Sequence, residues 1–358
     1  MGEFKYLVLA NSLRSDILSG KYRKRQKLPS ENELCKKLGL SRQTVRQAIE
    51  TLDAEGILER RQGSGTYVIF EEPQKKQPTK NIGIISTYTD AYIFPAIING
   101  ISEVLQENEY MMQLSLTHNQ VEHEARALKM LLEQNVDGFI VEPTKSGLPN
   151  PNIALYEQIK SQCIPLVFFN AYYSHLDFQY VCMDDRIAGY KAAKCLIDAG
   201  HKAIAGMFKS DDRQGHMRYM GFMDALNEAG METNSAGIIW FTTEDIPYLE
   251  EDIARVKRIL KGRTGLVCYN DQIAFPIVTA LIKEGYAVPQ NISVASIDNA
   301  EIATFCEVPL TSVAHPMAEL GRCAARSILK LIENPEEQVT VNFEPELIVR
   351  ESVKNIIE

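Results

Sequence analysis

The chain has 358 residues, of which 45% are hydrophobic and 24% are charged. This length is too great for one compact core, and the composition is that of a globular protein, which excludes the disordered and fibrous classes. The net charge of −9 is divided unevenly, because residues 1–80 hold 16 basic and 10 acidic residues whereas residues 81–358 hold 22 and 37. This asymmetry is typical of a polyanion-binding head on an acidic body, and charge alone is equally consistent with a solvated basic face on an enzyme.

A first helix is expected to end near Gly20, with Leu7, Leu13, Ile17 and Leu18 on its buried face. Its charges are interspersed with its apolar residues, which is not the pattern of a signal peptide. No apolar run in the chain approaches the roughly 18–20 residues that span a bilayer. We therefore expect a cytoplasmic protein with no membrane partner.

The next two helices have clear boundaries. Ser30 and Glu33 have the spacing of a capping box, so a helix is predicted to begin there and to stop at Gly39. Ser41 is expected to cap the third helix. The buried positions expected on these two helices are Leu34, Leu38, Val45, Ala48, Ile49 and Leu52.

The third helix carries long polar side chains in its first two turns, where a recognition helix presents them to the major groove. These side chains are Arg42, Gln43, Thr44, Arg46 and Gln47. Residues 56–68 then predict a β-hairpin with Arg60, Arg61 and Gln62 at its tip, in reach of phosphates. Each of these residues alone is more often a solvated surface group. Together they predict a winged helix-turn-helix (α+β) that reads DNA.

The run LPSENELCKKLGLSRQTVRQAIETLDAEGILERRQGSGTYV resembles the GntR family of bacterial winged-helix regulators, over nearly all of residues 3–69. The resemblance implies operator double-stranded DNA as the partner, and it implies contacts from Arg42, Thr44 and Arg46 and from Gln62 and Gly63 in the wing. The full set of candidate DNA-binding residues is Ser30, Ser41, Arg42, Gln43, Thr44, Arg46, Gln47, Arg61, Gln62 and Gly63.

Residues 71–80 contain two prolines and no large apolar residue. This composition is typical of a hydrated, semi-extended linker. We therefore divide the chain into a DNA-binding domain at 1–70, a linker at 71–80 and an effector domain at 81–358.

From residue 81 onward, short apolar strands alternate with amphipathic helices. This alternation is typical of parallel sheets covered on both faces, and two such sets predict two α/β lobes. Strands are expected at residues 81–85, 138–141, 166–169, 203–208, 265–269 and 293–297, and helices at 97–105, 153–159, 188–196, 219–229 and 273–282.

Polar residues follow the predicted strands, at the sheet edge where open parallel sheets bind ligands. They are Tyr88, Thr89, Asp90, Glu142, Asn170, Asp184, Asp185, Lys209, Asp211, Asp212, Asn270, Asp271, Asp298, Asn299 and His315. Any one Asp or Asn there is more often a helix cap. So many carboxylates and amides, with Tyr92, Phe94 and Tyr172 nearby, favour a carbohydrate site.

The motifs VCMDDRIAGYKAAKCLIDAGH, RYMGFMDAL, CYNDQIA, SIDNAEIA, VPLTSVAHP and FEPELIVRES resemble the effector domain of the lactose/ribose repressor family, over roughly residues 81–352. The resemblance implies a two-lobed, periplasmic-binding-protein-like fold, with His315 at the third crossover between the lobes. The family's hinge helix is absent, and the Pro/Lys linker stands in its place. The candidate ligand-binding residues are Tyr92, Phe94, Glu142, Asn170, Asp184, Arg218, Asn270, Asp298 and His315.

A GntR-type head on this body resembles a family of bacterial repressors, and this resemblance implies L-arabinose as effector and arabinose-use genes as targets. We expect a homodimer on a two-fold symmetric operator, released when sugar closes the lobes. The alternative is a pentose-processing enzyme that uses strand-end carboxylates such as Asp184 and Asp185. The chain shows no nucleophile motif, and apart from His118 and His123, which are five residues apart and are read as a solvated helix start, it shows no metal-ligand spacing of His or Cys. We therefore predict no catalysis, no cofactor and no metal.

Overall fold

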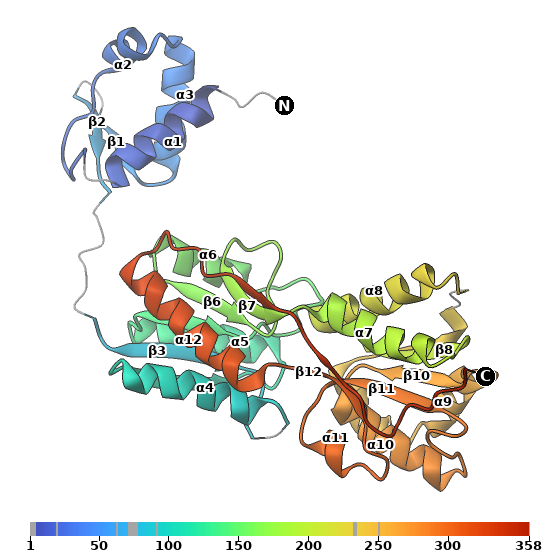
Figure 1. The fold of residues 1–358 in the computed structure, drawn as a ribbon. Helices are drawn as coiled ribbons and strands as arrows, with labels where there is room; N and C mark the ends of the chain where they lie inside the picture. Colours follow the sequence, from blue (N-terminus) through green and yellow to red (C-terminus); the bar gives the residue numbers. More distant parts are fainter. Residues whose placement is uncertain are drawn as a thin grey trace. The chain divides into compact units, whose positions relative to one another are not determined.

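The structure is a computed structural model that describes residues 5–18, 21–61, 64–70, 78–90, 92–231, 235–249 and 251–357. The chain separates into two compact units, residues 1–77 and 78–358, called here the head and the body (Figure 1). The predicted linker falls largely on residues 71–77, which lie outside the described residues.

The head is a winged helix. Its elements are α1 (Lys5–Leu18), α2 (Glu31–Leu38), α3 (Arg42–Ala54), β1 (Leu58–Arg61) and β2 (Gly65–Val68). The two strands pair antiparallel, with Leu58 opposite Val68 and Arg61 opposite Gly65. The hairpin directly after α3 is the predicted wing.

Local capping chemistry defines α2 and α3, as predicted. The Glu33 amide donates to the Ser30 hydroxyl over 3.3 Å, and the Glu33 carboxylate accepts from the Ser30 amide over 2.7 Å. Gly39 ends α2 at φ +65°, a left-handed conformation that glycine adopts without strain. Ser41 accepts from the Thr44 amide over 3.2 Å and so caps α3.

The head core confirms the predicted face of α3, together with Leu13 and Ile17 on α1 and Leu34 on α2, and corrects the prediction for Leu7 and Leu38. The side chain of Leu18 lies outside the described residues. Leu7 is 40% exposed, because two residues of helix rotate it away from the buried Leu9 and toward the opposite side. Leu38 is 45% exposed, because it lies in the last turn of α2, where Gly39 redirects the chain. The buried residues of the head are Leu9, Ala10, Leu13, Ile17, Leu28, Leu34, Val45, Ala48, Ile49, Leu52, Leu58 and Val68.

The body has two α/β lobes. Among the described residues, lobe 1 is built on a parallel sheet of strand order β13-β7-β6-β5-β3-β4. Its elements are β3 (Asn81–Ser86), α4 (Phe94–Glu107), β4 (Met111–Leu116), α5 (Val121–Glu133), β5 (Gly138–Val141), α6 (Ile153–Ser161), β6 (Leu166–Phe169), β7 (Gln179–Met183), α12 (Met317–Glu333) and β13 (Val341–Phe343). The apolar strands β3, β5 and β6 are buried, as expected for a sheet covered on both faces.

Lobe 2 repeats this architecture, with strand order β14-β12-β11-β10-β8-β9 among the described residues. Its elements are α7 (Asp185–Asp198), β8 (Ile204–Lys209), α8 (Arg213–Glu228), η1 (Ser235–Gly237), β9 (Ile238–Phe241), η2 (Thr243–Tyr248), α9 (Ile253–Leu260), β10 (Gly265–Cys268), α10 (Asp271–Lys283), β11 (Ser293–Asp298), α11 (Ile302–Phe305), β12 (Thr311–Ala314) and β14 (Leu347–Ile348). The edge strand β14 pairs antiparallel with β12, and the other pairs are parallel. The predicted parallel sheets are confirmed in both lobes.

The described chain crosses between the lobes three times, after β7, after β12 and after β13 (Figure 1). After the second crossing α12 returns to lobe 1 and packs into its core through Leu320, Ala324 and Ile328. The family resemblance implied that His315 lies at the third crossing. The structure instead places it in this second crossing. The third crossing joins β13 to β14, two very short strands that apolar patterning did not reveal.

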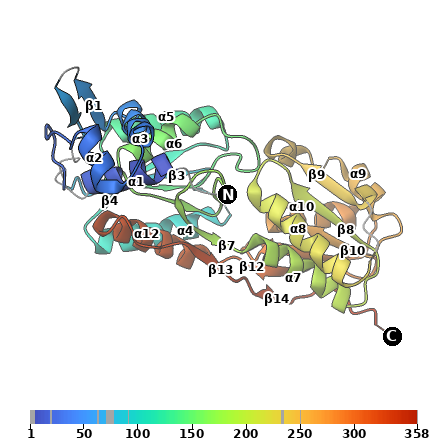
Figure 2. The ribbon, with the colours of Figure 1, turned by 90° about the horizontal axis from the view of Figure 1, so that it is seen from above.

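Each lobe contains one helix pair in backbone contact, α4 with α12 and α7 with α8 (Figure 2). A Cβ atom on Gly100 of α4 would lie 2.2 Å from the Ala318 carbonyl oxygen, and one on Gly221 of α8 would lie 1.8 Å from the Arg186 carbonyl oxygen. Only glycine fits at such distances. The α7–α8 contact sets the distance between the starts of these helices, which carry site residues.

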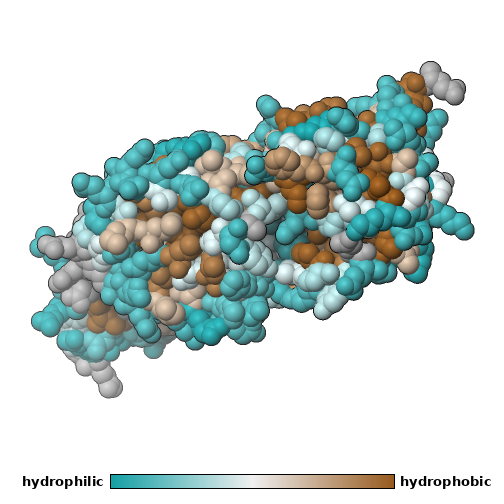
Figure 3. Space-filling view, turned by 90° about the horizontal axis from the view of Figure 1, so that it is seen from below, coloured by the Kyte–Doolittle hydropathy of each residue, from teal (hydrophilic) through white to brown (hydrophobic). Residues whose placement is uncertain are grey.

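The surface drawn in Figure 3 is largely hydrophilic, and its hydrophobic residues form separate patches. Across the part of the chain that the structure describes, none of the helices combines the length and the hydropathy that a membrane span requires.

Candidate functional site

The head presents the predicted polar face of α3 to solvent. Arg42, Gln43, Arg46 and Gln47 are exposed, and Thr44 is half-buried. The Arg42 side chain is 73% exposed and lies 3.5 Å from Glu31, so it is only weakly held. This face has the donors and acceptors that bidentate contacts with guanine and adenine require.

The other candidate DNA residues surround this face. Ser30 and Ser41 are the caps of α2 and α3, so their hydroxyls already bind backbone amides. Arg61 ends β1, where it is exposed and bonds Glu59 over 2.8 Å. Gln62 and Gly63 lie outside the described residues.

Arg60, which the sequence placed at the wing tip, is half-buried. Its guanidinium donates to Glu50 over 3.1 Å and to the Arg46 carbonyl oxygen over 3.3 Å, and it lies 3.7 Å from Glu31. Arg60 therefore fixes the wing against α2 and α3.

The body contains a cavity of about 310 Å³ between its two lobes. The chain segments that follow the strands of both sheets line it, as the rule for open parallel sheets predicts. Its lining residues are Thr87, Tyr88, Asp90, Tyr92, Ile93, Phe94, Asn119, Glu142, Pro143, Asn170, Lys209, Asp212, Gln214, Arg218, Thr243, Ile246, Pro247, Tyr269, Asn270, Gln272, Ile273 and Asp298. They include Tyr92, Phe94, Glu142, Asn170, Arg218, Asn270 and Asp298 from the sequence prediction.

Arg218 is the buried cation of this site, and 1% of its side chain is exposed. It donates to Asp185 over 2.8 Å, to Asp298 over 3.0 Å and to the Tyr269 carbonyl oxygen over 2.8 Å. Burial raises the pKa of Asp185 to about 6, although the neighbouring Arg218 opposes that shift. Arg218 is thus satisfied by two carboxylates and a carbonyl.

Tyr92 reaches from lobe 1 into this cluster in lobe 2. Its hydroxyl donates to the second carboxylate oxygen of Asp298 over 2.7 Å and accepts from the Asp271 amide over 3.2 Å. Asp271 is fully buried beside it, and its carboxylate accepts from the hydroxyls of Ser296 and Ser312. Burial raises the pKa of Asp271 to about 7.

Glu142 and Asn170 form the facing wall in lobe 1. One carboxylate oxygen of Glu142 accepts from the Thr87 amide over 2.7 Å and the Thr87 hydroxyl over 2.6 Å, and the other accepts from the Asn170 amide over 3.0 Å. Burial raises the pKa of Glu142, and these donors oppose the shift. The carboxamide oxygen of Asn170 is buried and has no partner within the described chain, so it is a vacant acceptor at the cavity wall.

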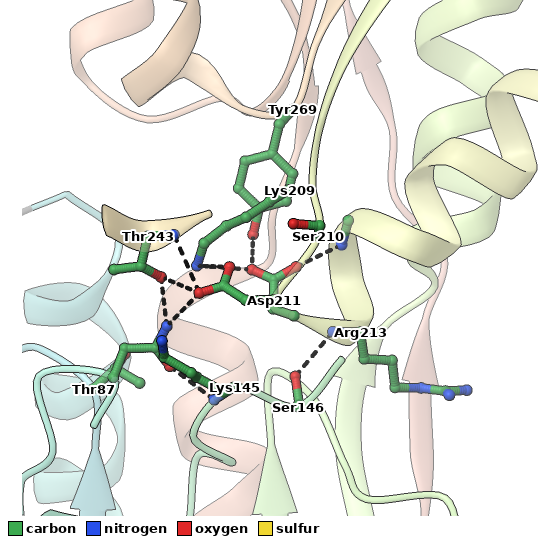
Figure 4. Close-up of polar contacts among 12 residues, drawn as sticks. Thr87, Lys145, Ser146, Lys209, Ser210, Asp211, Arg213, Thr243 and Tyr269 are labelled. Atoms are coloured by element: carbon green, nitrogen blue, oxygen red, sulfur yellow. Dashed lines mark hydrogen bonds and ion pairs between the residues drawn. The ribbon is translucent and has the colours of Figure 1, made fainter. Parts of the chain in front are cut away.

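Further contacts join the lobes on one side of the cavity (Figure 4). Asn119 of lobe 1 donates to Asp211 over 3.3 Å and to the Thr243 hydroxyl over 2.5 Å, both in lobe 2. The Lys145 ammonium of lobe 1 forms an ion pair with the Glu244 carboxylate of lobe 2, with 2.5 Å between Nζ and Oε1. These bonds exist only while the lobes are together.

Two candidate ligand residues lie outside the cavity lining. Asp184 caps α7 by accepting from the Ile187 amide over 3.0 Å. His315 is buried behind Asp298, where burial lowers its pKa to about 4. Since Asp184 caps a helix while Asp185 bonds Arg218, the two adjacent carboxylates have separate partners and do not form an acid/base pair.

Sequence reasoning missed Asn119 and Thr243. They follow the edge strands β4 and β9, which the strand prediction did not include. The run Ile238-Ile239-Trp240-Phe241 carried an apolar signal for β9, whereas β4 mixes exposed and half-buried residues and carried none. Within the described residues no cluster of His, Cys, Asp and Glu is arranged to hold a metal ion.

Comparisons with known proteins agree with both units. Residues 5–68 match the model of bacterial regulatory proteins of the gntR family, and residues 193–353 match the periplasmic binding protein-like domain. The crystal structure of the transcription regulator CcpA of Lactococcus lactis superposes with a TM-score of 0.69 at 26% identity, covering 78% of this chain and 100% of that one.

Two curated relatives are similar along nearly the whole chain. The arabinose metabolism transcriptional repressor of Halalkalibacterium halodurans is 41% identical, covering 98% of this chain and 96% of its own. The protein of the same name from Geobacillus stearothermophilus is 38% identical, covering 98% of both. The chain therefore belongs to the family of bacterial arabinose metabolism transcriptional repressors, with a GntR-type winged-helix head and a periplasmic-binding-protein-like body.

Proposed function

We propose that this protein is a sequence-specific repressor of arabinose-utilisation genes that leaves its operator when L-arabinose binds between the lobes of its body. The observation that carries the proposal is the polar cavity of about 310 Å³, lined by both lobes, in the same chain as a winged-helix head. The names of the two full-length relatives support arabinose as the effector.

The cavity favours a small neutral sugar. Its volume is at the lower end of ligand sites, which run from about 300 to 1,000 Å³. Both cations in its lining are paired, Arg218 with two carboxylates and Lys209 with Asp212 over 3.1 Å. A sugar phosphate would therefore find no unpaired cation, whereas hydroxyl groups find acceptors at Asp298 and Asn170.

The proposed ligand contacts divide by chemistry. Glu142, Asn170, Arg218, Asn270 and Asp298 would bind sugar hydroxyls. The ring of Phe94, which packs edge-on against Tyr88 at 5.7 Å, offers an apolar wall for sugar C–H groups. Tyr92 borders the same space.

In the head, the exposed face of α3 would read bases and the wing would contact the DNA backbone. Arg42, Gln43, Thr44, Arg46 and Gln47 are the proposed reading residues, with Arg61, Gln62 and Gly63 in the wing. Ser30 and Ser41 hold the starts of α2 and α3, whose amide groups suit phosphates.

We infer a homodimer that places two heads on a two-fold symmetric operator. Sugar stabilises the closed lobes through their mutual contacts, and closure weakens operator binding. Because coupling is reciprocal, operator must weaken sugar binding by the same factor.

Isothermal titration of L-arabinose into the full-length protein tests this coupling, with and without an operator duplex selected by the protein from a random pool. We expect a lower sugar affinity in the presence of operator. Equal affinities would refute the coupling. A thermal-shift panel of L-arabinose, D-xylose, D-ribose and a pentose phosphate tests the effector, since a bound ligand stabilises in proportion to the logarithm of its concentration above the dissociation constant.

A further inference from the structure

The wing has a third, short strand-like edge that lies before α2 in the sequence. The Arg25 amide donates to the Val68 carbonyl oxygen over 2.8 Å, and the Leu28 amide donates to the Thr66 carbonyl oxygen over 2.9 Å. Lys27 thereby forms an antiparallel bridge with Tyr67. Lys27 is part of the wing sheet although it precedes the wing hairpin by some thirty residues.

The pairing register places Lys27 on a defined face of this sheet. Tyr67 is opposite Lys27 on one side and Glu59 on the other, so these three side chains share a face. Arg61 and Gly65, two residues from Glu59 and Tyr67, belong to the same face because side chains alternate along a strand.

Gly65 leaves room for the Lys27 side chain. A Cβ atom on Gly65 would lie 2.5 Å from Lys27 Cε and 3.2 Å from its Nζ. The Lys27 stem therefore lies across Gly65, at the end of the wing where Gly65 pairs with Arg61.

The two cations of this face differ in their charge balance. Arg61 bonds Glu59 over 2.8 Å, and its guanidinium carbon lies 4.8 Å from the centre of the Tyr67 ring. Lys27 is exposed, and no ion pair joins it to a carboxylate within the described residues. Glu33 lies near enough for the Lys27 charge to help lower its pKa, after the larger effect of the Ser30 hydrogen bonds, but the two groups are not in ion-pair contact. Lys27 is therefore the less compensated of these two cations.

We propose that Lys27 is a phosphate-contacting residue of the wing, and that it supplies more of the wing's attraction for the DNA backbone than Arg61. The inference rests on the proposed DNA binding by the head. A phosphate contact positions the protein on the duplex and carries no base preference. Lys27 should therefore act equally on specific and on mixed-sequence DNA.

The test is the salt dependence of binding to a fluorescently labelled, mixed-sequence duplex, measured with the full-length protein by anisotropy. Each phosphate neutralised contributes about 0.9 to the slope of log K against log salt. We expect Lys27→Met to reduce the slope by about that amount per bound head, because methionine keeps an unbranched stem over Gly65 and loses only the charge. Lys27→Arg should retain the slope, and Arg61→Met should change it less than Lys27→Met.

Lys21→Met is the matched control. The Lys21 ammonium lies 2.8 Å from Asp16, so its removal should leave the slope near that of the wild type. An unchanged slope for Lys27→Met, with an unchanged melting curve by circular dichroism, would overturn the inference. If Lys27→Met has a lower melting temperature than the wild type, Lys27→Arg becomes the deciding variant. Because arginine keeps the charge, a reduced slope for Lys27→Arg would overturn the inference. Absence of DNA binding by the wild type would refute the proposed function itself, which is a different result.

Discussion

The Tyr92 hydroxyl bridges the lobes, and its removal gives the sharpest test of closure. Tyr92→Phe keeps the ring but loses the bond to the Asp298 carboxylate and the bond from the Asp271 amide. A bond to a charged group contributes about 1.5–3 kcal/mol and a neutral one about 0.5–1.5 kcal/mol, so the closed form should lose roughly 2–4.5 kcal/mol against separated lobes whose groups are hydrated. At about 1.4 kcal/mol per tenfold, sugar affinity should fall roughly 30- to 1,600-fold when the open form predominates without sugar.

Isothermal titration with L-arabinose measures this loss, and small-angle scattering of the sugar-free protein reports whether the lobes separate. Tyr110→Phe is the control, since Tyr110 lies in lobe 1 away from the cavity. We expect this control to bind like the wild type. If Tyr92→Phe binds arabinose within about twofold of the wild type, the bridge contributes little to closure and the reasoning fails.

Two further predictions concern the buried charges of the body. Arg218→Met should lower the free energy of unfolding by about 3–5 kcal/mol, because Asp185 and Asp298 would stay buried without their cation; urea unfolding measures the loss, and a value below about 1 kcal/mol would contradict it. Because burial raises the folded pKa of Asp271 to about 7, far above its ordinary value of 3.8, this residue makes the body less stable as pH rises from about 4 to 7. His315, with a folded pKa lowered to about 4 from 6.5, has the opposite effect and makes the body less stable as pH falls between those values. The test is the gain in melting temperature on acidification from pH 7 to pH 5. Asp271→Asn should make this gain smaller than in the wild type, and His315→Gln should make it larger. An unchanged pH dependence in both variants would exclude burial as the cause.

The head could be predicted closely because its signals are local. The Ser30–Glu33 capping box, the Gly39 stop and the Ser41 cap each depend on residues within one helical turn. The exposure of Leu7 and Leu38 could not be predicted in the same way, because it depends on which side of each helix the other helices cover.

The cavity was predictable to the extent that polar residues follow strands with strong apolar patterns, as Asn170, Asn270 and Asp298 do. Asn119 escaped because β4 is a half-exposed edge strand, whose composition differs little from that of a loop. The different roles of Asp184 and Asp185 could not be predicted either, because only the position of α8 decides which carboxylate bonds Arg218. The contact of Lys27 with the wing could not be predicted, because Lys27 and its partner Tyr67 are far apart in the chain.

The return of α12 to lobe 1 has a consequence for the order in which the body forms during synthesis. The strands β8 to β12 of lobe 2 are all contained in residues 204–314, whereas lobe 1 lacks α12 and β13 until residue 343 has been made. Most of lobe 2 therefore lies between the first and the last strands of lobe 1, and only β14 and the residues after it follow. Although lobe 1 comes first in the sequence, it cannot complete its core on the ribosome until Leu320, Ala324 and Ile328 have been made, more than two hundred residues after its first strand. A chain that stops just after β12 would then carry a nearly complete lobe 2 joined to a lobe 1 whose apolar face is open to solvent.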